Sequence, residues 1–473
     1  MEYQEIIDRL KHIVDTPTHP IPEGTLSKIK ERYYAQHGRS AALYEKAKEV
    51  IPGGVEHNLS LEKPFPITMD RAKGYKMWDI DGNEYVDYLM SGAPIILGHH
   101  YDPLDNKIID IIKEKGPSTG CTSEYEILAA QEVIKHVPNV EMVRFLQSGT
   151  ESVMAALRIA RIYTQKDKII KIGGSYHGWS DQVVYSLHVP GAGQLESAGI
   201  PSDCFNNMVD VFPNDFEGLK TAFEENKSKG GIAAVIVEPI GGESGTHPVH
   251  PDWNNAIRKL CDEYGSLLIF DEVVTGFRLG LAGAQKYFNV NADIVVFGKI
   301  ISHGYPAAGG IGGRKDIMAI CSGVGSIGQK AYIGGTLSAN PISTAACYYA
   351  LKLMEENDAV QKAADYADKL TKEMNTLFST REDLPFFAFN FGPIIHYETT
   401  GMLSVSVHNP DVFNEVMTRR HIAQDYQMVI IDQGIFTLAG SRMYTCMQHD
   451  KEALDKTIRA WEYTLSLIPK GQG

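Results

Sequence analysis

The residues best suited to chemistry in this sequence lie where short apolar runs give way to polar side chains. Lys299 closely follows the apolar run 294–297, and Asp271 follows the run 267–270. A lysine at the end of a buried strand is desolvated, which lowers its pKa and makes its amine a Schiff-base nucleophile. A carboxylate at that depth must be paired or hydrogen-bonded, and it suits a protonated ring nitrogen or a metal ion. A snorkelling lysine and a capping or ion-paired acid are the structural alternatives.

Two further polar segments follow apolar runs. Ser148, Gly149 and Thr150 lie between the run 142–146 and a helical stretch. The free backbone N–H groups at the start of a helix can bind an anion, or a Ser or Thr side chain there can simply be the N-cap of the helix. Tyr176 and His177 follow the run 168–172, where an aromatic side chain stacks on a planar ring or fills the core. A phosphate site, a stacking face, a strand-end acid and a strand-end lysine together predict one cofactor, pyridoxal phosphate.

Motifs for other cofactors and for metals fail here. Gly323-Val-Gly-Ser-Ile-Gly has the spacing of a dinucleotide loop, but it follows a predicted helix rather than a strand. The six cysteines form no CxxC pair, and no Walker A, HExxH or GxSxG sequence occurs. The adjacent His99 and His100 point to opposite faces of an extended segment. We therefore predict no metal site.

A parallel sheet must position these residues. Apolar runs at 142–146, 168–172, 233–238, 267–270 and 294–297 alternate with helical stretches at 151–163, 216–229 and 253–264. Buried strands separated by helices predict an α/β fold, whose ligands bind at the carboxyl ends of the strands. Before this region, Asp81-Gly82 predicts a hairpin within residues 75–88. After it, we expect a helix from about 346, strands at 403–408 and 427–431, and a terminal helix at 451–467.

Composition predicts a cytoplasmic globular protein of more than one domain. The 473 residues carry 45 Lys and Arg against 59 Asp and Glu, a net charge of −14, which argues against nucleic-acid and anionic-membrane partners. The N-terminus lacks signal-peptide features, and no apolar run reaches the roughly 18 residues of a membrane helix. We expect an N-terminal helical extension (1–37), the first part of a small domain (38–95), a large cofactor-binding α/β domain (96–345) and a C-terminal small α+β domain (346–473).

From about residue 39 onward the sequence resembles the class III, fold-type I pyridoxal-phosphate aminotransferases, and within them the glutamate-1-semialdehyde aminomutase branch. The matching motifs are Ile51-Pro-Gly-Gly-Val, Ser148-Gly-Thr-Glu-Ser-Val-Met, Tyr176-His-Gly, Val237-Glu-Pro, Phe270-Asp-Glu-Val-Val-Thr-Gly-Phe-Arg, Gly298-Lys and Gly334-Gly-Thr-Leu-Ser-Ala-Asn-Pro. The resemblance implies a mostly parallel central sheet flanked by helices, a smaller α+β domain, pyridoxal 5'-phosphate as cofactor, and a homodimer with shared active sites.

The same resemblance implies residue roles. Lys299 matches the Schiff-base lysine that also moves the proton, and Asp271 matches the carboxylate on the pyridine nitrogen. Residues 180–201 resemble a lid. The cofactor contacts implied are Ser148, Gly149 and Thr150 at the phosphate, Thr336 from the neighbouring subunit, Tyr176 stacked on the ring, Val273 on its opposite face, and His177 and Glu238 from the matching motifs.

Substrate recognition departs from the aminomutase branch. Ser60 lies where that branch has an arginine for the substrate carboxylate. Arg442 matches instead the arginine with which ω-aminotransferases bind an α-carboxylate, and Glu243 matches the acid that neutralises this arginine when no carboxylate is bound; His303 is a further candidate to line the site. We expect an aminotransferase that moves an amino group between an amino acid (an α-, β- or ω-amine) and a keto acid. The alternative is an isomerase, either an aminomutase or an amino-acid racemase or epimerase. A racemase would need a second proton donor facing Lys299, for which His303 and Tyr176 are the candidates.

Overall fold

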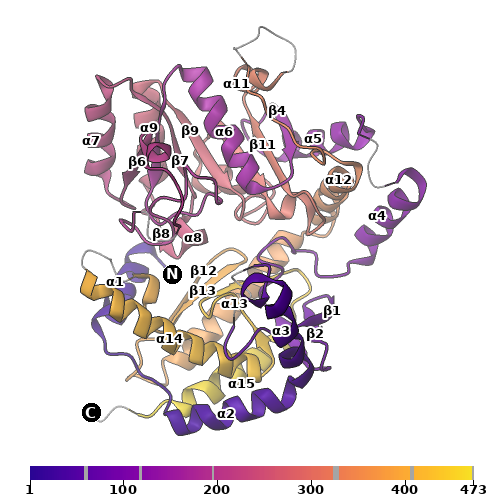
Figure 1. Cartoon of the computed structure of the whole chain (residues 1–473), viewed down its shortest axis with the longest axis vertical. Coiled ribbons are helices and arrows are strands. Elements are labelled where there is room, and N and C mark those ends of the chain that lie inside the picture. The colour runs from indigo at the N-terminus through magenta and orange to yellow at the C-terminus, as the bar shows by residue number, and fades with distance from the viewer. Residues whose placement is uncertain (58–61, 117–119, 194–196, 323–329, 405–409, 471–473) are drawn as a thin grey trace.

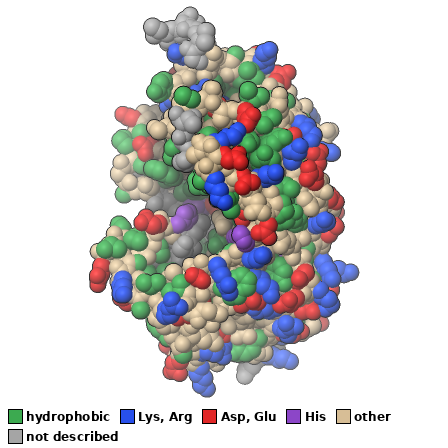
Figure 2. Space-filling view, turned by 90° about the vertical axis from the view of Figure 1, so that its right-hand side faces the viewer, with side chains coloured by type: hydrophobic (Ala, Val, Ile, Leu, Met, Phe, Trp, Pro, Cys, Tyr) green, Lys and Arg blue, Asp and Glu red, His purple; other side chains and the backbone are tan. Residues whose placement is uncertain are grey.

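The computed structural model describes the chain apart from residues 58–61, 117–119, 194–196, 323–329, 405–409 and 471–473. It has two lobes (Figure 1): the upper one contains a seven-stranded sheet, and the lower one contains two smaller sheets and both ends of the chain. Figure 2 shows a hollow between the lobes with histidine side chains at its edge. None of the helices in the described ranges is long and apolar enough to cross a membrane.

The sheet of the upper lobe is mostly parallel. Its order is β4-β11-β10-β9-β7-β5-β6, and only β11 runs antiparallel to its neighbours β10 and β4. The strands are β4 Met142–Leu146, β5 Lys168–Ile172, β6 Met208–Val211, β7 Ile232–Val237, β9 Leu267–Glu272, β10 Ile294–Gly298 and β11 Gly309–Gly313. The predicted α/β architecture is confirmed. We did not predict β11, because its sequence Gly-Gly-Ile-Gly-Gly has almost no β-propensity.

Successive residues of these strands enter two separate cores. On β9, Leu268 and Phe270 pack into the core under one set of helices, whereas Leu267 and Ile269 pack under α6 on the other face. The first set consists of α4 Asp102–Lys115, α5 Glu124–His136, α7 Phe216–Lys227, α9 Trp253–Tyr264 and α12 Pro341–Glu356. Helix α6 is Gly149–Thr164, and the short elements α8 Gly242–Gly245, β8 His247–Pro248, α10 Gly283–Phe288 and α11 Lys315–Met318 complete the lobe.

The lower lobe combines the two ends of the sequence. One sheet has the order β1-β2-β3-β14 and the other β12-β13-β15. The predicted hairpin is confirmed as β2 and β3, and β3 pairs in parallel with β14 through Val86 and Ile435. The strands are β1 Met69–Lys73, β2 Lys76–Asp79, β3 Glu84–Asp87, β12 Phe387–Phe391, β13 Ile394–Glu398, β14 Ile435–Phe436 and β15 Arg442–Tyr444; the helices are α1 Tyr3–Asp15, α2 Glu23–Gln36, α3 Gly38–Val50, α13 Ala359–Phe378, α14 Pro410–Asp432 and α15 Lys451–Leu467.

The N-terminal helices dock on the lower lobe of the same chain. Ile6 and Leu10 of α1 pack with Phe387 and Phe389 of β12. Arg419 of α14 donates hydrogen bonds to the carbonyl oxygens of residues 13 and 14. The extension is thus part of the hydrophobic structure of this lobe. The domain boundaries given above stay a prediction.

The predicted strand at 427–431 is wrong, because these residues form the last turns of α14. Met428, Val429, Ile430 and Ile431 are all buried. A helical segment that is buried on every side is apolar all round, so its short apolar run cannot be told from a strand by periodicity. The predicted strand at 403–408 falls partly on a 3-10 turn at Met402–Ser404, and residues 405–408 lie outside the described residues.

Candidate active site

The predicted chemical residues meet at the carboxyl edge of the large sheet. Asp271 lies near the end of β9, and Lys299 directly follows the parallel neighbour β10, whose Val296 is in register with Asp271. Ser148 follows β4, Tyr176 and His177 follow β5, and Glu238 follows β7. The convergence follows from topology, because parallel strands bring their carboxyl ends to one edge.

Asp271 and His177 form a buried pair. The Nδ1 atom of His177 lies 2.7 Å from Oδ2 of Asp271, and the other oxygen, Oδ1, accepts the Val273 N–H at 3.1 Å. Burial lowers the pKa of His177, although the hydrogen bond to Asp271 opposes this shift. A neutral imidazole therefore donates its Nδ1 proton to the carboxylate and fixes its orientation. The strand-end acid is thus hydrogen-bonded, as its depth requires.

Lys299 carries a partly buried amine directly after β10. Its backbone adopts the left-handed region, with φ of 47°, at the turn after β10. Burial lowers the pKa of Lys299, and the positive charge of Arg442 lowers it further. Within the described ranges its Nζ makes neither a hydrogen bond nor an ion pair, so the amine is available to a ligand.

Glycines bring the segments of the site close together. A Cβ added to Gly149 would lie 2.8 Å from Cγ2 of Val273, and one added to Gly298 would lie 2.8 Å from Cγ1 of the same side chain. A Cβ on Gly178, which has a φ of 88°, would collide with Thr150. The start of α6, the turn after β9, the residue before Lys299 and the loop after β5 are therefore in contact. A side chain at Gly149, Gly178 or Gly298 would push these segments apart.

The start of α6 is a helix N-terminus open to an anion. Ser148 is its N-cap, and its Oγ accepts the Glu151 N–H at 3.2 Å. The next N–H groups, those of Gly149 and Thr150, belong to the first turn, which has no intrahelical acceptors. An anion site, a hydrogen-bonded acid and an unpartnered amine around a glycine-lined space fit a phosphate-bearing aromatic aldehyde.

Tyr176 stacks on another protein residue. Its ring lies 5.8 Å from that of His188 with an interplanar angle of 11°, and 43% of the residue is exposed. Burial raises the pKa of Tyr176, and the charges of Glu243 and Asp271 add to the rise, which places the phenol near both acids. Since His188 belongs to residues 180–201, the predicted lid segment reaches the site.

Glu238 organises the loop that follows β7. One carboxylate oxygen accepts the N–H groups of Tyr176 (2.9 Å) and Glu243 (3.0 Å), and the other accepts that of Ser244 (2.9 Å). Burial, followed by the charges of Glu243 and Asp271, raises the pKa of Glu238 to about 8. Its hydrogen bonds join the loop after β5 to α8.

Glu243 and Arg442 form an ion pair between the two lobes. Nη2 of Arg442 lies 2.8 Å from Oε2 of Glu243, and Nη1 lies 2.8 Å from the Glu243 carbonyl oxygen. The Glu243 backbone is left-handed (φ 55°), and its carboxylate also lies 3.1 Å from Nε2 of His188. Burial alone would raise the pKa of Glu243, but the charges of Arg442 and His188 lower it below its ordinary value. This arrangement presents a buried guanidinium with a replaceable carboxylate partner.

Two other predicted residues, His303 and Thr336, form no hydrogen bond or ion pair with this group among the described residues. The Nε2 atom of His303 accepts the N–H groups of Leu97 (3.0 Å) and Ile96 (3.3 Å). Burial, the main cause, lowers the pKa of His303 to about 3, so the ring is neutral and a poor proton donor. Thr336 is exposed in the single chain. Ser60 and the glycines at 323–328 lie outside the described residues.

Two residues around Arg442, His188 and Glu398, were not predicted from the sequence. His188 contacts both Tyr176 and Glu243, and only its place in the predicted lid hinted at the site. Glu398 ends β13, and burial raises its pKa to about 7, although the charge of Arg442 opposes the rise. Neither position has a local motif that could have revealed it.

Comparisons with known proteins give consistent results. The sequence profile of the family described as Aminotransferase class-III matches residues 60–385. A protein named glutamate-1-semialdehyde 2,1-aminomutase from Methanothrix thermoacetophila is 36% identical over 442 residues, which cover 90% of this chain and 96% of that protein. Among solved structures, an omega-transaminase from Sphaerobacter thermophilus superimposes with a TM-score of 0.81 at 25% identity, covering 92% of this chain and 98% of that one. A structure described as a transaminase with PLP bound gives a TM-score of 0.80 at 26% identity, covering 92% and 99%.

Proposed function

We propose that this chain, which belongs to the class III aminotransferase family and takes pyridoxal phosphate as its cofactor, is an isomerase of the aminomutase type. The observation that carries the proposal is the 36% identity to a glutamate-1-semialdehyde 2,1-aminomutase across 90% of this chain and 96% of the relative. This reverses the preference for an aminotransferase drawn from the sequence and adopts its stated alternative. The chemistry that both reactions share rests on the same residues.

Lys299 and Asp271 carry the proton chemistry in this proposal. Pyridoxal phosphate, when bound, supplies an aldehyde that condenses with amines and a ring that accepts electrons. Burial, together with the charge of Arg442, lowers the pKa of Lys299 and so favours the neutral amine, whose Nζ would take a proton from the substrate carbon and return it at another position. Asp271, oriented by His177, would hold the ring nitrogen of the bound cofactor in its protonated form. Ser148, Gly149 and Thr150 bind the phosphate.

Three further contacts complete the cofactor site. Val273, which lies between Gly149 and Gly298, would contact one face of the bound cofactor, and Tyr176, near Glu243 and Asp271, would contact the other. Glu238 fixes the loop that carries Tyr176. We place Thr336 on the phosphate of a second copy of the chain. The segment around it leaves Tyr332 85% exposed, which suits burial in a homodimer interface.

Arg442 is our choice for the group that binds the substrate carboxylate. Its guanidinium is buried and held by Glu243, so an incoming carboxylate can replace Glu243 as its bidentate partner. This residue would perform the role for which the aminomutase branch uses an arginine at the position of Ser60. The substrates are small amino compounds that carry a carboxylate.

The proposed reaction needs no second substrate. In 4-amino-5-oxopentanoate, the compound named glutamate-1-semialdehyde, the amino group moves from C4 to C5 and the oxo group from C5 to C4. The product, 5-amino-4-oxopentanoate, is an isomer, so atoms and electrons balance without a keto acid.

Net amino transfer is the second candidate, and the Arg442–Glu243 pair favours it. A cation with a replaceable partner accepts substrates with and without a carboxylate in turn, as alternate amino donors and acceptors require. The likeness to an omega-transaminase at 25% identity agrees with this candidate.

An assay of substrate conversion in the absence of any keto acid distinguishes isomerisation from net amino transfer. Holoenzyme is mixed with 4-amino-5-oxopentanoate, and the products are resolved by chromatography. We expect catalytic formation of 5-amino-4-oxopentanoate, reduced at least ~100-fold in Lys299→Ala. If the compound gives no isomer, and amino acids instead convert the cofactor to its amine form until a keto acid is added, the isomerase proposal fails and amino transfer replaces it.

A further inference from the structure

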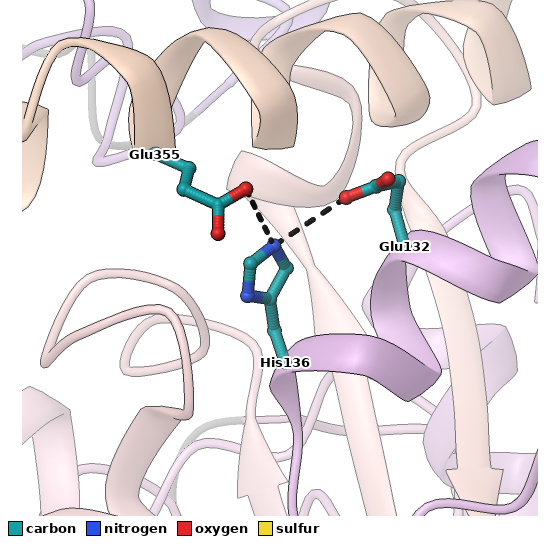
Figure 3. Close-up of side chains that lie close together, drawn as sticks. All are labelled: Glu132, His136 and Glu355. Atoms are coloured by element: carbon teal, nitrogen blue, oxygen red, sulfur yellow. Dashed lines mark ion pairs between the residues drawn. The ribbon is translucent and has the colours of Figure 1, made fainter.

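A cluster of possible metal ligands lies on the outer helices of the upper lobe. Glu132 and His136 are four residues apart on α5, so they share one face of that helix, and Glu355 faces them from the end of α12 (Figure 3). One donor atom from each of the three lies within 4.8 Å of the other two. This is the one such group of three in the described parts of the chain, and none of its members belongs to the candidate active site.

The imidazole of this cluster has a mostly buried side chain that faces two carboxylates. The His136 side chain is 8% exposed, and its Nε2 points at both carboxylates, as Figure 3 shows. Nε2 lies 3.4 Å from Oε2 of Glu132 and 3.9 Å from Oε2 of Glu355. Among the described residues, neither His136 Nε2 nor Glu132 Oε2 has a hydrogen-bond partner. Such buried polar atoms require an explanation.

A cation between these atoms supplies that explanation. Zinc binds nitrogen and carboxylate oxygen at about 2.0–2.2 Å in tetrahedral geometry, which puts neighbouring ligand atoms about 3.4 Å apart. The distance from His136 to Glu132 already has this value, and Glu355, whose side chain is 44% exposed, has room to move closer. We propose that Glu132, His136 and Glu355 bind a divalent transition-metal cation of the Zn²⁺ type. Imidazole with carboxylates suits this class of ion, and water completes its coordination.

Lys135 forms ion pairs with the two carboxylates of the cluster. Its Nζ lies 2.5 Å from Oε2 of Glu355 and 3.6 Å from Oε2 of Glu132, so it competes with a cation for both carboxylates. The lysine side chain is about half exposed (49%) and can turn outward.

The metal would connect two helices that are remote in sequence. Helix α5 precedes β4, whereas α12 begins at Pro341, shortly after the segment that carries Thr336. A bound ion would therefore link the C-terminal end of α12 to α5. Its expected role is to stabilise the lobe, since its ligands lie on elements that do not carry Lys299 or Asp271.

Zinc titration of the full-length holoenzyme tests the proposal. After treatment with a chelator, calorimetry with ZnCl₂ should show one site per chain that is weakened on the order of 10–100-fold in His136→Gln and in Glu355→Gln. Lys135→Met should bind zinc more tightly, because the competing ammonium is gone. His100→Gln is the matched control, because it removes an exposed histidine that also lies beside two carboxylates.

Thermal unfolding gives a second readout that does not depend on activity. Zinc should raise the midpoint of the wild type and of His100→Gln but not that of His136→Gln, because only a ligand of the native state stabilises it. Circular dichroism of the metal-free variants checks that each is folded. The proposal is overturned if His136→Gln binds zinc with the same stoichiometry and affinity as the wild type, or if the wild type binds none.

Discussion

Replacing Glu243 with glutamine should separate the structural and functional roles of its ion pair with Arg442. The substitution keeps the size of the side chain and removes its charge. Arg442 then keeps its hydrogen bond to the Glu243 carbonyl oxygen but loses the carboxylate 2.8 Å from its Nη2. We expect lower stability together with tighter binding of carboxylate ligands.

The size of both effects follows from the burial of the pair. At 2.8 Å and an effective dielectric constant of about 20, two unit charges attract by about 6 kcal/mol before desolvation is counted. Removing one member of a buried pair typically costs ~3–5 kcal/mol. The side chains are 8% and 13% exposed, so we expect about 3 kcal/mol. Glu243→Gln combined with Arg442→Met should recover most of that loss, because no buried charge is left unpaired.

Two measurements test this reasoning. Urea unfolding at a fixed cofactor concentration gives the stability change, and inhibition by pentanoate, a carboxylate without an amine, reports access to Arg442. The inhibition constant should fall at least ~10-fold in Glu243→Gln, a change of about 1.4 kcal/mol. Glu398→Gln is the matched control, because it removes another buried acid near Arg442 without breaking the pair. If both variants lose similar stability and neither binds pentanoate more tightly, the ion pair does not act as we infer.

Three further outcomes are expected. Burial lowers the pKa of Lys171 to about 8, below its ordinary value of 10.5, so the folded state binds fewer protons than the unfolded state between these pH values. As the pH rises through this window, the free energy of unfolding of the wild type, measured by urea titration, should increase by about 3 kcal/mol relative to that of Lys171→Met. Parallel pH dependences of the two proteins would contradict this prediction. Leu10→Ala should cost about 2 kcal/mol by removing contacts between α1 and β12, whereas the exposed Lys11→Ala should cost less than ~0.5 kcal/mol in the same measurement. Tyr332→Asp should shift the protein from dimer to monomer in a sedimentation experiment, whereas Val50→Asp, at a similarly exposed position, should not. If Tyr332→Asp remains a dimer, our placement of the interface is wrong.

Most of the upper lobe could be predicted because its strands are short, apolar and separated by helices. The predicted ranges 142–146 and 168–172 coincide with β4 and β5, and the terminal helix coincides with α15. Prediction failed where local sequence lacks a periodic signal. The glycines of β11 are selected by tertiary contact, since a Cβ on Gly309 would collide with the Ser148 carbonyl oxygen. The end of α14 was mistaken for a strand because all of its faces are buried.

Residues of the site could be predicted when a motif at a strand end marked them. Asp271 and Lys299 are of this kind, and the sheet brings them together. Contacts between side chains on elements that lie far apart in the sequence could not be found in this way. His188 reaches Glu243 through a loop, and Glu355 reaches His136 from a helix more than 200 positions further along the chain. Such contacts depend on the packing of whole elements, which a single sequence does not encode locally.

The pairing of β3 with β14 has a consequence for synthesis on the ribosome. The edge of β3 that pairs with β14 through Val86 and Ile435 stays unpaired until Ile435 has been synthesised. At about 5–20 residues per second, the roughly 350 intervening residues take about 20–70 seconds to emerge. During that time the upper lobe can fold, while the first 95 residues present an open strand edge and the uncovered apolar face of α1. A chain truncated before residue 435 would therefore leave its own N-terminal segment unpaired, with an exposed edge that favours aggregation.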